Sequence, residues 1–162
     1  MQLDDLWQII ETARAGEGDT ADLVRQALAQ RPADEIYSYL ELQSSLMEQS
    51  YTWELWGAAY VANGGCSDDG FDYFRGWLLA QGRAAFERAL SEPDSIADLV
   101  EEQEEAEYED MIGAAVLAYK DVTGAYPDGP PVMLPNLGES WDFDDADEMR
   151  RRYPRLWAKL GA

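Results

Sequence analysis

One short segment of this sequence constrains the fold more than any other. Residues 52–62, TWELWGAAYVA, contain a single charged residue, Glu54, and are apolar on nearly every side of a helix. A helix with this pattern lies in the interior of a globular protein, so we predict that it is the central buried helix. Its small residues predict close-packed neighbours. A larger residue at Gly57 or Ala59 should overpack the core at a cost of about 1–3 kcal/mol.

Apolar periodicity and turn residues predict helices along most of the chain. The predicted helices cover about 3–15, 20–31, 33–50, 68–80, 83–90 and 111–119, with a further turn or two at 95–100. We expect Thr20 to cap the second helix and Pro32 to be the first residue of the third. The apolar helix at 111–119 is placed against the one at 52–62. The fold class is all-α, a compact multi-helix bundle of about seven to eight helices.

The C-terminal part has a different composition. Four prolines between Tyr126 and Pro135 remove backbone donors and exclude a helix, so residues 123–145 are predicted to form an ordered Pro-rich strap across the helices. A basic helix is expected at 146–162, with Pro154 kinking or restarting it. A chain of 162 residues has the size of one domain. We therefore predict a single helical domain, 1–162, with a motif-bearing core at 1–122.

The charge balance limits the partners of this chain. It has 33 acidic and 12 basic residues and a net charge of -21, which argues against nucleic acid or an anionic membrane as a partner. A protein with a basic surface remains as a partner. We find no apolar stretch long enough to span a membrane and no signal peptide, so a cytoplasmic location is expected. The oligomeric state is left open.

The absence of histidine restricts the chemistry. It removes the commonest general base and the commonest zinc ligand, and the single Cys66 cannot form an internal disulfide. A buried, unreactive thiol is expected. The run 67–72 lacks the alternating oxygen ligands and the distant glutamate of an EF-hand calcium loop. We therefore predict no cofactor, no metal site and no catalytic residue.

The candidate site follows the glycine turn at 63–65. Asp68, Asp72 and Arg75 are four and three residues apart, so they share one face of the helix predicted there. In the functional interpretation, Asp68, Asp69, Asp72, Arg75 and Trp77 form a ligand pocket at the N-terminus of this helix. Arg75 would clamp an anion or carboxylate, an aspartate would act as acid, base or metal ligand, and Trp77 would belong to a stacking wall.

A structural interpretation explains the same residues. Asp69 would be the helix cap, Asp72 would favour the helix dipole, and Arg75 would tie the turn to its own carboxylates. It accounts for these three residues without a ligand. The sequence leaves both interpretations open.

An acidic run at 101–110, EEQEEAEYED, is the second candidate surface. It would serve as a docking surface for a basic protein, as a mimic of phosphate spacing, or as a solvated helix face or flexible connection. Its best internal partner is the arginine cluster at 150–155. Exposed pairs of this kind contribute about 0–1 kcal/mol each.

Two motifs resemble a known family. The run YTWxLWxAAY at 51–60 and the run GGCSDDGFxYFRxWL at 64–78 are similar to those of a bacterial family of small cytoplasmic proteins, classified only as a domain of unknown function. The similarity covers about residues 3–122. It implies an independently folding domain and no particular reaction.

These observations favour a protein of unknown function that acts in binding or regulation through the face at 64–77 or through its acidic surface. One alternative is an enzyme with an Asp/Arg pocket at the N-terminus of the helix at 71–80. An acidic DNA-mimic inhibitor is the other. An enzyme needs a concave pocket that holds aspartate and Arg75, whereas an interaction protein would show those groups mutually satisfied and an exposed patch elsewhere.

Overall fold

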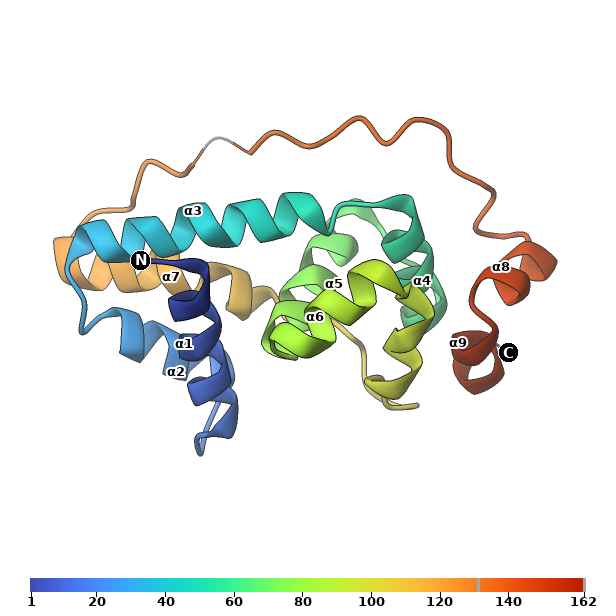
Figure 1. The fold of residues 1–162 in the computed structure, drawn as a ribbon, viewed down its shortest axis with the longest axis horizontal. Coiled ribbons are helices and arrows are strands. Elements are labelled where there is room, and N and C mark those ends of the chain that lie inside the picture. Colours follow the sequence, from blue (N-terminus) through green and yellow to red (C-terminus); the bar gives the residue numbers. More distant parts are fainter. Residues whose placement is uncertain (131, 162) are drawn as a thin grey trace.

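The computed structural model describes residues 1–130 and 132–161, and within these residues it is all-helical, without strands (Figure 1). This confirms the all-α class. The helices outnumber the predicted seven to eight, with nine α-helices and one 3-10 helix in the described residues. They are α1 (Leu3–Ala15), α2 (Thr20–Leu28), α3 (Ala33–Gln49), α4 (Trp53–Asn63), α5 (Asp68–Ala80), α6 (Arg83–Ser91), η1 (Pro93–Asp98), α7 (Glu109–Thr123), α8 (Ala146–Arg152) and α9 (Pro154–Leu160).

Helix α4 is buried, as its apolar pattern predicts. Its buried residues are Leu55, Trp56, Gly57, Ala58, Ala59 and Val61. The Thr52 hydroxyl accepts a hydrogen bond from the Leu55 amide at 3.2 Å and caps the helix. Gly64, with φ of 67°, ends it in the left-handed conformation that glycine adopts without steric cost. The glycine turn at 63–65 is confirmed as the end of this helix.

The predicted contact between α4 and the apolar helix α7 is wrong. Helix α7 packs mainly against α2, α3 and α5, whereas α4 packs against α5, η1 and α9. The close approach that decides this is at Gly76 of α5, where an added Cβ would lie 2.6 Å from the Tyr108 carbonyl oxygen just before α7. The Tyr108 amide also donates to the Tyr73 carbonyl at 2.9 Å. Gly76 therefore lets the chain enter α7 alongside α5.

Thr20 and Pro32 each lie one position away from the role predicted for them at a helix start. The cap of α2 is Asp19 rather than Thr20, because the Asp19 carboxylate accepts from the Asp22 amide at 3.1 Å. Pro32 occupies the extended position before α3 instead of its first turn, with φ of -65° and ψ of 154°. Threonine and aspartate both cap helices, and proline occurs both before a helix and in its first turn. The sequence therefore does not fix which residue is the cap, and the backbone conformation does.

The described residues between α7 and α8, 124–130 and 132–145, are called segment 124–145 below and run from the end of α7 past α3 to α8 (Figure 1). Its described residues contain no helix. Hydrogen bonds tie the segment to the helices, among them one from the Met133 amide to Glu48 Oε1 at 3.1 Å and one from Trp53 Nε1 to the Gly138 carbonyl at 3.1 Å. Val132, Met133 and Leu134 stay 55–77% exposed. The segment therefore leaves these three side chains in water beside α3, whereas Trp141 and Phe143 near its end pack against the core.

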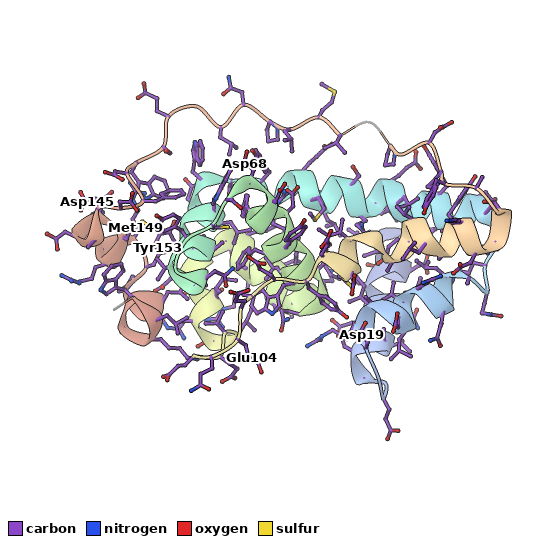
Figure 2. All side chains as sticks on the ribbon, turned by 180° about the vertical axis from the view of Figure 1, so that it is seen from behind. Asp19, Asp68, Glu104, Asp145, Met149 and Tyr153 are labelled. Carbon is purple, nitrogen blue, oxygen red and sulfur yellow. The ribbon has the colours of Figure 1, made fainter. Side chains whose placement is uncertain are left out.

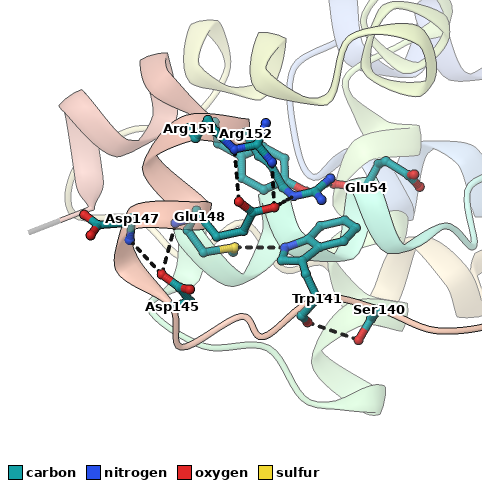
Figure 3. Close-up of polar contacts among 10 residues, drawn as sticks. Glu54, Ser140, Trp141, Asp145, Asp147, Glu148, Arg151 and Arg152 are labelled. Carbon is teal, nitrogen blue, oxygen red and sulfur yellow. Dashed lines mark hydrogen bonds and ion pairs between the residues drawn. The ribbon is translucent and has the colours of Figure 1, made fainter.

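The basic C-terminal region forms two helices, since α9 restarts at Pro154. Glu148 pairs with both Arg151 and Arg152 at 2.7 Å (Figure 3). The predicted pairing of this arginine cluster with the acidic run at 101–110 is wrong in the described residues, because carboxylates three or four positions away on the same helix are nearer. Helix α9 is anchored on η1, where Arg155 pairs with Asp98 and the Asp94 carboxylate accepts from the Leu156 amide at 2.9 Å.

Candidate functional site

Helix α5 begins with a serine cap. Ser67 Oγ accepts a hydrogen bond from the Gly70 amide at 3.2 Å, so the expectation that an aspartate caps this helix is wrong. Asp68 and Asp69 lie in the first helical turn and are exposed, and Figure 2 labels Asp68 on this turn. The extended backbone of Ser67 places the cap one residue before the aspartates. Their carboxylates still favour the positive end of the helix dipole.

This arrangement predicts different effects of two substitutions. Ser67→Ala should lower the free energy of unfolding by about 1 kcal/mol, because the Gly70 amide loses its partner. Asp69→Ala should cost only about 0.3–1 kcal/mol, since only a charge near the helix dipole is lost. Urea denaturation of both variants checks the order. A larger loss for Asp69→Ala would contradict the assignment of the cap.

Arg75 is the buried centre of the candidate residues, with 2% of its surface exposed. Its Nε donates to the Phe71 carbonyl at 3.3 Å and its Nη1 to the Met47 carbonyl at 2.5 Å, while Nη2 pairs with Asp72. The guanidinium carbon lies 4.7 Å from the ring centre of Phe71 and 5.1 Å from that of Tyr51. Each nitrogen of the guanidinium therefore has a partner inside the protein.

The electrostatics of Arg75 follow from this position. Burial lowers the pKa of Arg75, and the Asp72 carboxylate opposes that shift. The side chain joins α5 to the last turn of α3, where helix carbonyls lack intrahelical partners. These contacts support the structural interpretation of Arg75. They also link α5 to α3, which the sequence did not indicate. They leave little of the guanidinium available to clamp an anion.

The structure brings only two of the five candidate residues into one cavity. Asp72 and Arg75 line a cavity of about 330 Å³ between α3, α5, α7 and four residues of segment 124–145, which are Gly129, Pro130, Val132 and Leu134. Asp68 and Asp69 lie outside it, on the exposed first turn of α5. Trp77 is half-buried outside the cavity, with its ring 5.5 Å from that of Phe74. The five residues therefore do not line this cavity together.

Sequence reasoning missed the other polar residues of this cavity, Gln43, Ser44 and Glu48 of α3. Gln43 had a signal, because it is a polar amide on the otherwise apolar side of its helix, in register with Tyr39 and Leu40. Ile112 and Val116 also line the cavity, because α7 packs beside α3. Nothing in the sequence near these two residues indicates that packing.

Cys66 lies next to the start of α5 as a half-buried free thiol. Burial first and then the Glu107 carboxylate raise the pKa of Cys66 to about 12, which agrees with the prediction of an unreactive thiol. Across residues 1–130 and 132–161, no three carboxylate or thiol side chains are grouped as a metal site would require. In the same residues, no helix combines the length and the apolar character needed to cross a membrane.

The comparisons with known proteins assign a family without an activity. No curated protein and no solved structure matches this chain. A family model described as "Protein of unknown function (DUF4240)" matches residues 1–121. The match includes the three helices that line the cavity, up to near the end of α7, and excludes segment 124–145, α8 and α9. The chain therefore belongs to the DUF4240 family.

Proposed function

We propose that this protein is a binding or regulatory protein whose acidic loop, residues 101–105, engages a basic surface of a partner protein. The supporting observation is that the arginine side chains form ion pairs with carboxylates of the same chain. Every arginine forms an internal ion pair; these residues are Arg14, Arg25, Arg31, Arg75, Arg83, Arg88, Arg150, Arg151, Arg152 and Arg155.

The two lysines are also engaged. Lys120 Nζ donates to the Tyr126 hydroxyl at 2.9 Å, and Lys159 Nζ donates to the Val100 carbonyl at 2.7 Å. Binding to a phosphate backbone requires a basic surface whose cations replace condensed counterions. The engaged cations thus support a basic partner over an anionic one.

The acidic loop has the opposite character. Its glutamates are exposed, and no ion pair within the described residues involves them; they are Glu101, Glu102, Glu104 and Glu105. Asn63 exchanges two hydrogen bonds with the backbone of buried Ala106, at 2.8 and 3.3 Å. Figure 2 labels Glu104 on this loop. The end of the loop is therefore fixed while its carboxylates face water.

The proposal includes a cytoplasmic location, supported by the single free Cys66, which has no internal disulfide partner. An enzyme is supported less well. Its expected pocket would use Arg75 together with Asp68, Asp69 or Asp72, yet Arg75 is engaged by backbone carbonyls and Asp72. The expected catalytic aspartates of the first turn lie outside the cavity.

An oligolysine peptide tests the acidic loop as a model of a basic surface. We expect binding at about 50 mM salt that weakens steeply at about 300 mM, as for other charge-driven association. A variant with glutamine at the four loop glutamates should bind about tenfold more weakly, measured by fluorescence anisotropy of a labelled peptide.

A control variant removes the same charge elsewhere. It carries amides at four scattered, exposed carboxylates without ion pairs in the described residues, namely Glu17, Asp34, Glu41 and Glu139. We expect less than about a threefold change, because these charges lie outside the loop and are scattered over other segments. Equal weakening of both variants would contradict the loop as the binding surface. No binding of the unaltered protein at low salt would contradict the basic partner itself.

A further inference from the structure

The cavity between α3, α5, α7 and segment 124–145 has the dimensions of a small-molecule site. Its volume of about 330 Å³ lies at the lower end of the range for ligand pockets. Much of its wall is apolar and comes from Leu40, Met47, Ile112 and Val116. This site is separate from the acidic loop, and its argument does not depend on that proposal.

Gln43 gives this cavity an unpaired acceptor. The side chain is 6% exposed, and its Nε2 donates to the Ile112 carbonyl at 3.0 Å, while Oε1 has no partner in the described residues. The amide cannot be reversed, because its oxygen would then face another oxygen. A buried acceptor without a partner costs about as much as a lost hydrogen bond, and such groups are rare in folded proteins. A ligand that brings a donor would remove that cost.

The charges around the cavity favour a positively charged ligand. Asp72 and Glu48 place two carboxylates in the wall, against the single guanidinium of Arg75. Each nitrogen of that guanidinium already has a protein partner. A carboxylate or phosphate ligand would meet repulsion without a free cation to bind it. A protonated amine would meet the opposite charge and an unpaired acceptor.

Segment 124–145 supplies the fourth side of the cavity. Val132 and Leu134 line it, although they are 64% and 55% exposed. A ligand with an apolar body would remove part of this surface from water, which is favourable in proportion to the area buried. Gln43 Oε1 is shielded from solvent. The side chains of the cavity wall must therefore shift slightly before a donor group of the ligand can reach it.

We propose that this cavity binds a small amine with an apolar body. The ammonium group donates to Gln43 Oε1 and to the Asp72 carboxylate, and the hydrocarbon part lies against the apolar side chains of α3, α7 and segment 124–145. The family match does not describe such a site, and the net charge of the chain does not indicate one.

Three probes with the same six-carbon chain separate the contribution of the head group: hexylamine, hexanol and hexanoate. We expect hexylamine to bind with a Kd below about 1 mM, within the range that its few heavy atoms allow. Hexanol should bind several-fold more weakly, and hexanoate at least about tenfold more weakly than the amine. Titrations followed by NMR should shift the methyl signals of Ile112 and Val116. Equal or tighter binding of hexanoate, or no binding of hexylamine, would overturn the proposal.

A matched pair of variants tests the acceptor. Gln43→Met keeps a similar volume without the amide, and it should reduce hexylamine affinity about tenfold while changing hexanol affinity less, because the charged donor loses more. Gln49→Met alters an exposed glutamine of the same helix and should change neither affinity. Urea denaturation of each variant separates binding from folding. A folded Gln43→Met protein with unchanged hexylamine affinity would overturn the role of Gln43.

Discussion

Replacing Arg75 with alanine is expected to lower the free energy of unfolding by about 2–4 kcal/mol. The substitution removes the donors to the Met47 and Phe71 carbonyls and leaves a cavity beside the rings of Tyr51 and Phe71. The Met47 carbonyl keeps only the hydrogen bond from the Ser50 hydroxyl at 3.1 Å, and the loss of the guanidinium bonds adds to the lost packing. Urea denaturation followed by tryptophan fluorescence measures the change.

Asp72→Ala is the control for that experiment. Asp72 is the ion-pair partner of Arg75, but its side chain is 53% exposed, so water replaces part of the interaction. We expect a loss below about 1 kcal/mol. If both variants lost the same free energy, the ion pair would be the source of stability, and the assignment of Arg75 as a buried link between α3 and α5 would be wrong.

Gly57→Ala is expected to lower the free energy of unfolding by about 1–3 kcal/mol, although alanine is the better helix former. A Cβ at Gly57 would lie 2.9 Å from Cζ of Tyr153 and closer still to its hydroxyl. That ring is 3% exposed, and its hydroxyl donates to the Glu54 carbonyl at 2.6 Å, so it cannot swing into solvent. The strain should also loosen α8 and α9, which limited proteolysis would detect as earlier cleavage there.

Gly113→Ala provides the matched control, because a Cβ at this position of α7 meets no atom within 4 Å. This variant should be more stable than the unaltered protein by about 0.5–1 kcal/mol. In a Tyr153→Ala background the clash is absent, so Gly57→Ala should become neutral or stabilising. A persistent loss in that background would show that the contact with Tyr153 is not the cause.

Much of the secondary structure was predictable because its causes are local. The helix at residues 3–15 was predicted with the bounds found for α1, and the glycine turn after α4 was located correctly. Apolar spacing and the backbone freedom of glycine act within a few residues, so the sequence displays them directly. The predicted overpacking site at Gly57 was also local in origin, although the sequence did not show that Tyr153 fills the space.

The candidate site was predictable only in part. The pairing of Asp72 with Arg75 follows from their three-residue spacing on one helix. The carbonyl of Met47 and the amide of Gln43 come from another helix, and their distance from Arg75 depends on how α3 and α5 cross. For the same reason, the sequence favours the acidic run as partner of the arginine cluster at 150–155, whereas these arginines pair within α8 and with η1.

The sequence by itself determined the all-α class, the buried character of α4, the glycine turn and the acidic surface, because each depends on composition or on contacts within one helical turn. Only the tertiary structure decided that α7 lies against α2, α3 and α5, that Arg75 faces inward, and that Gln43 lines a cavity. These outcomes depend on the close approach of distant segments at positions such as Gly76, where a missing side chain sets the distance.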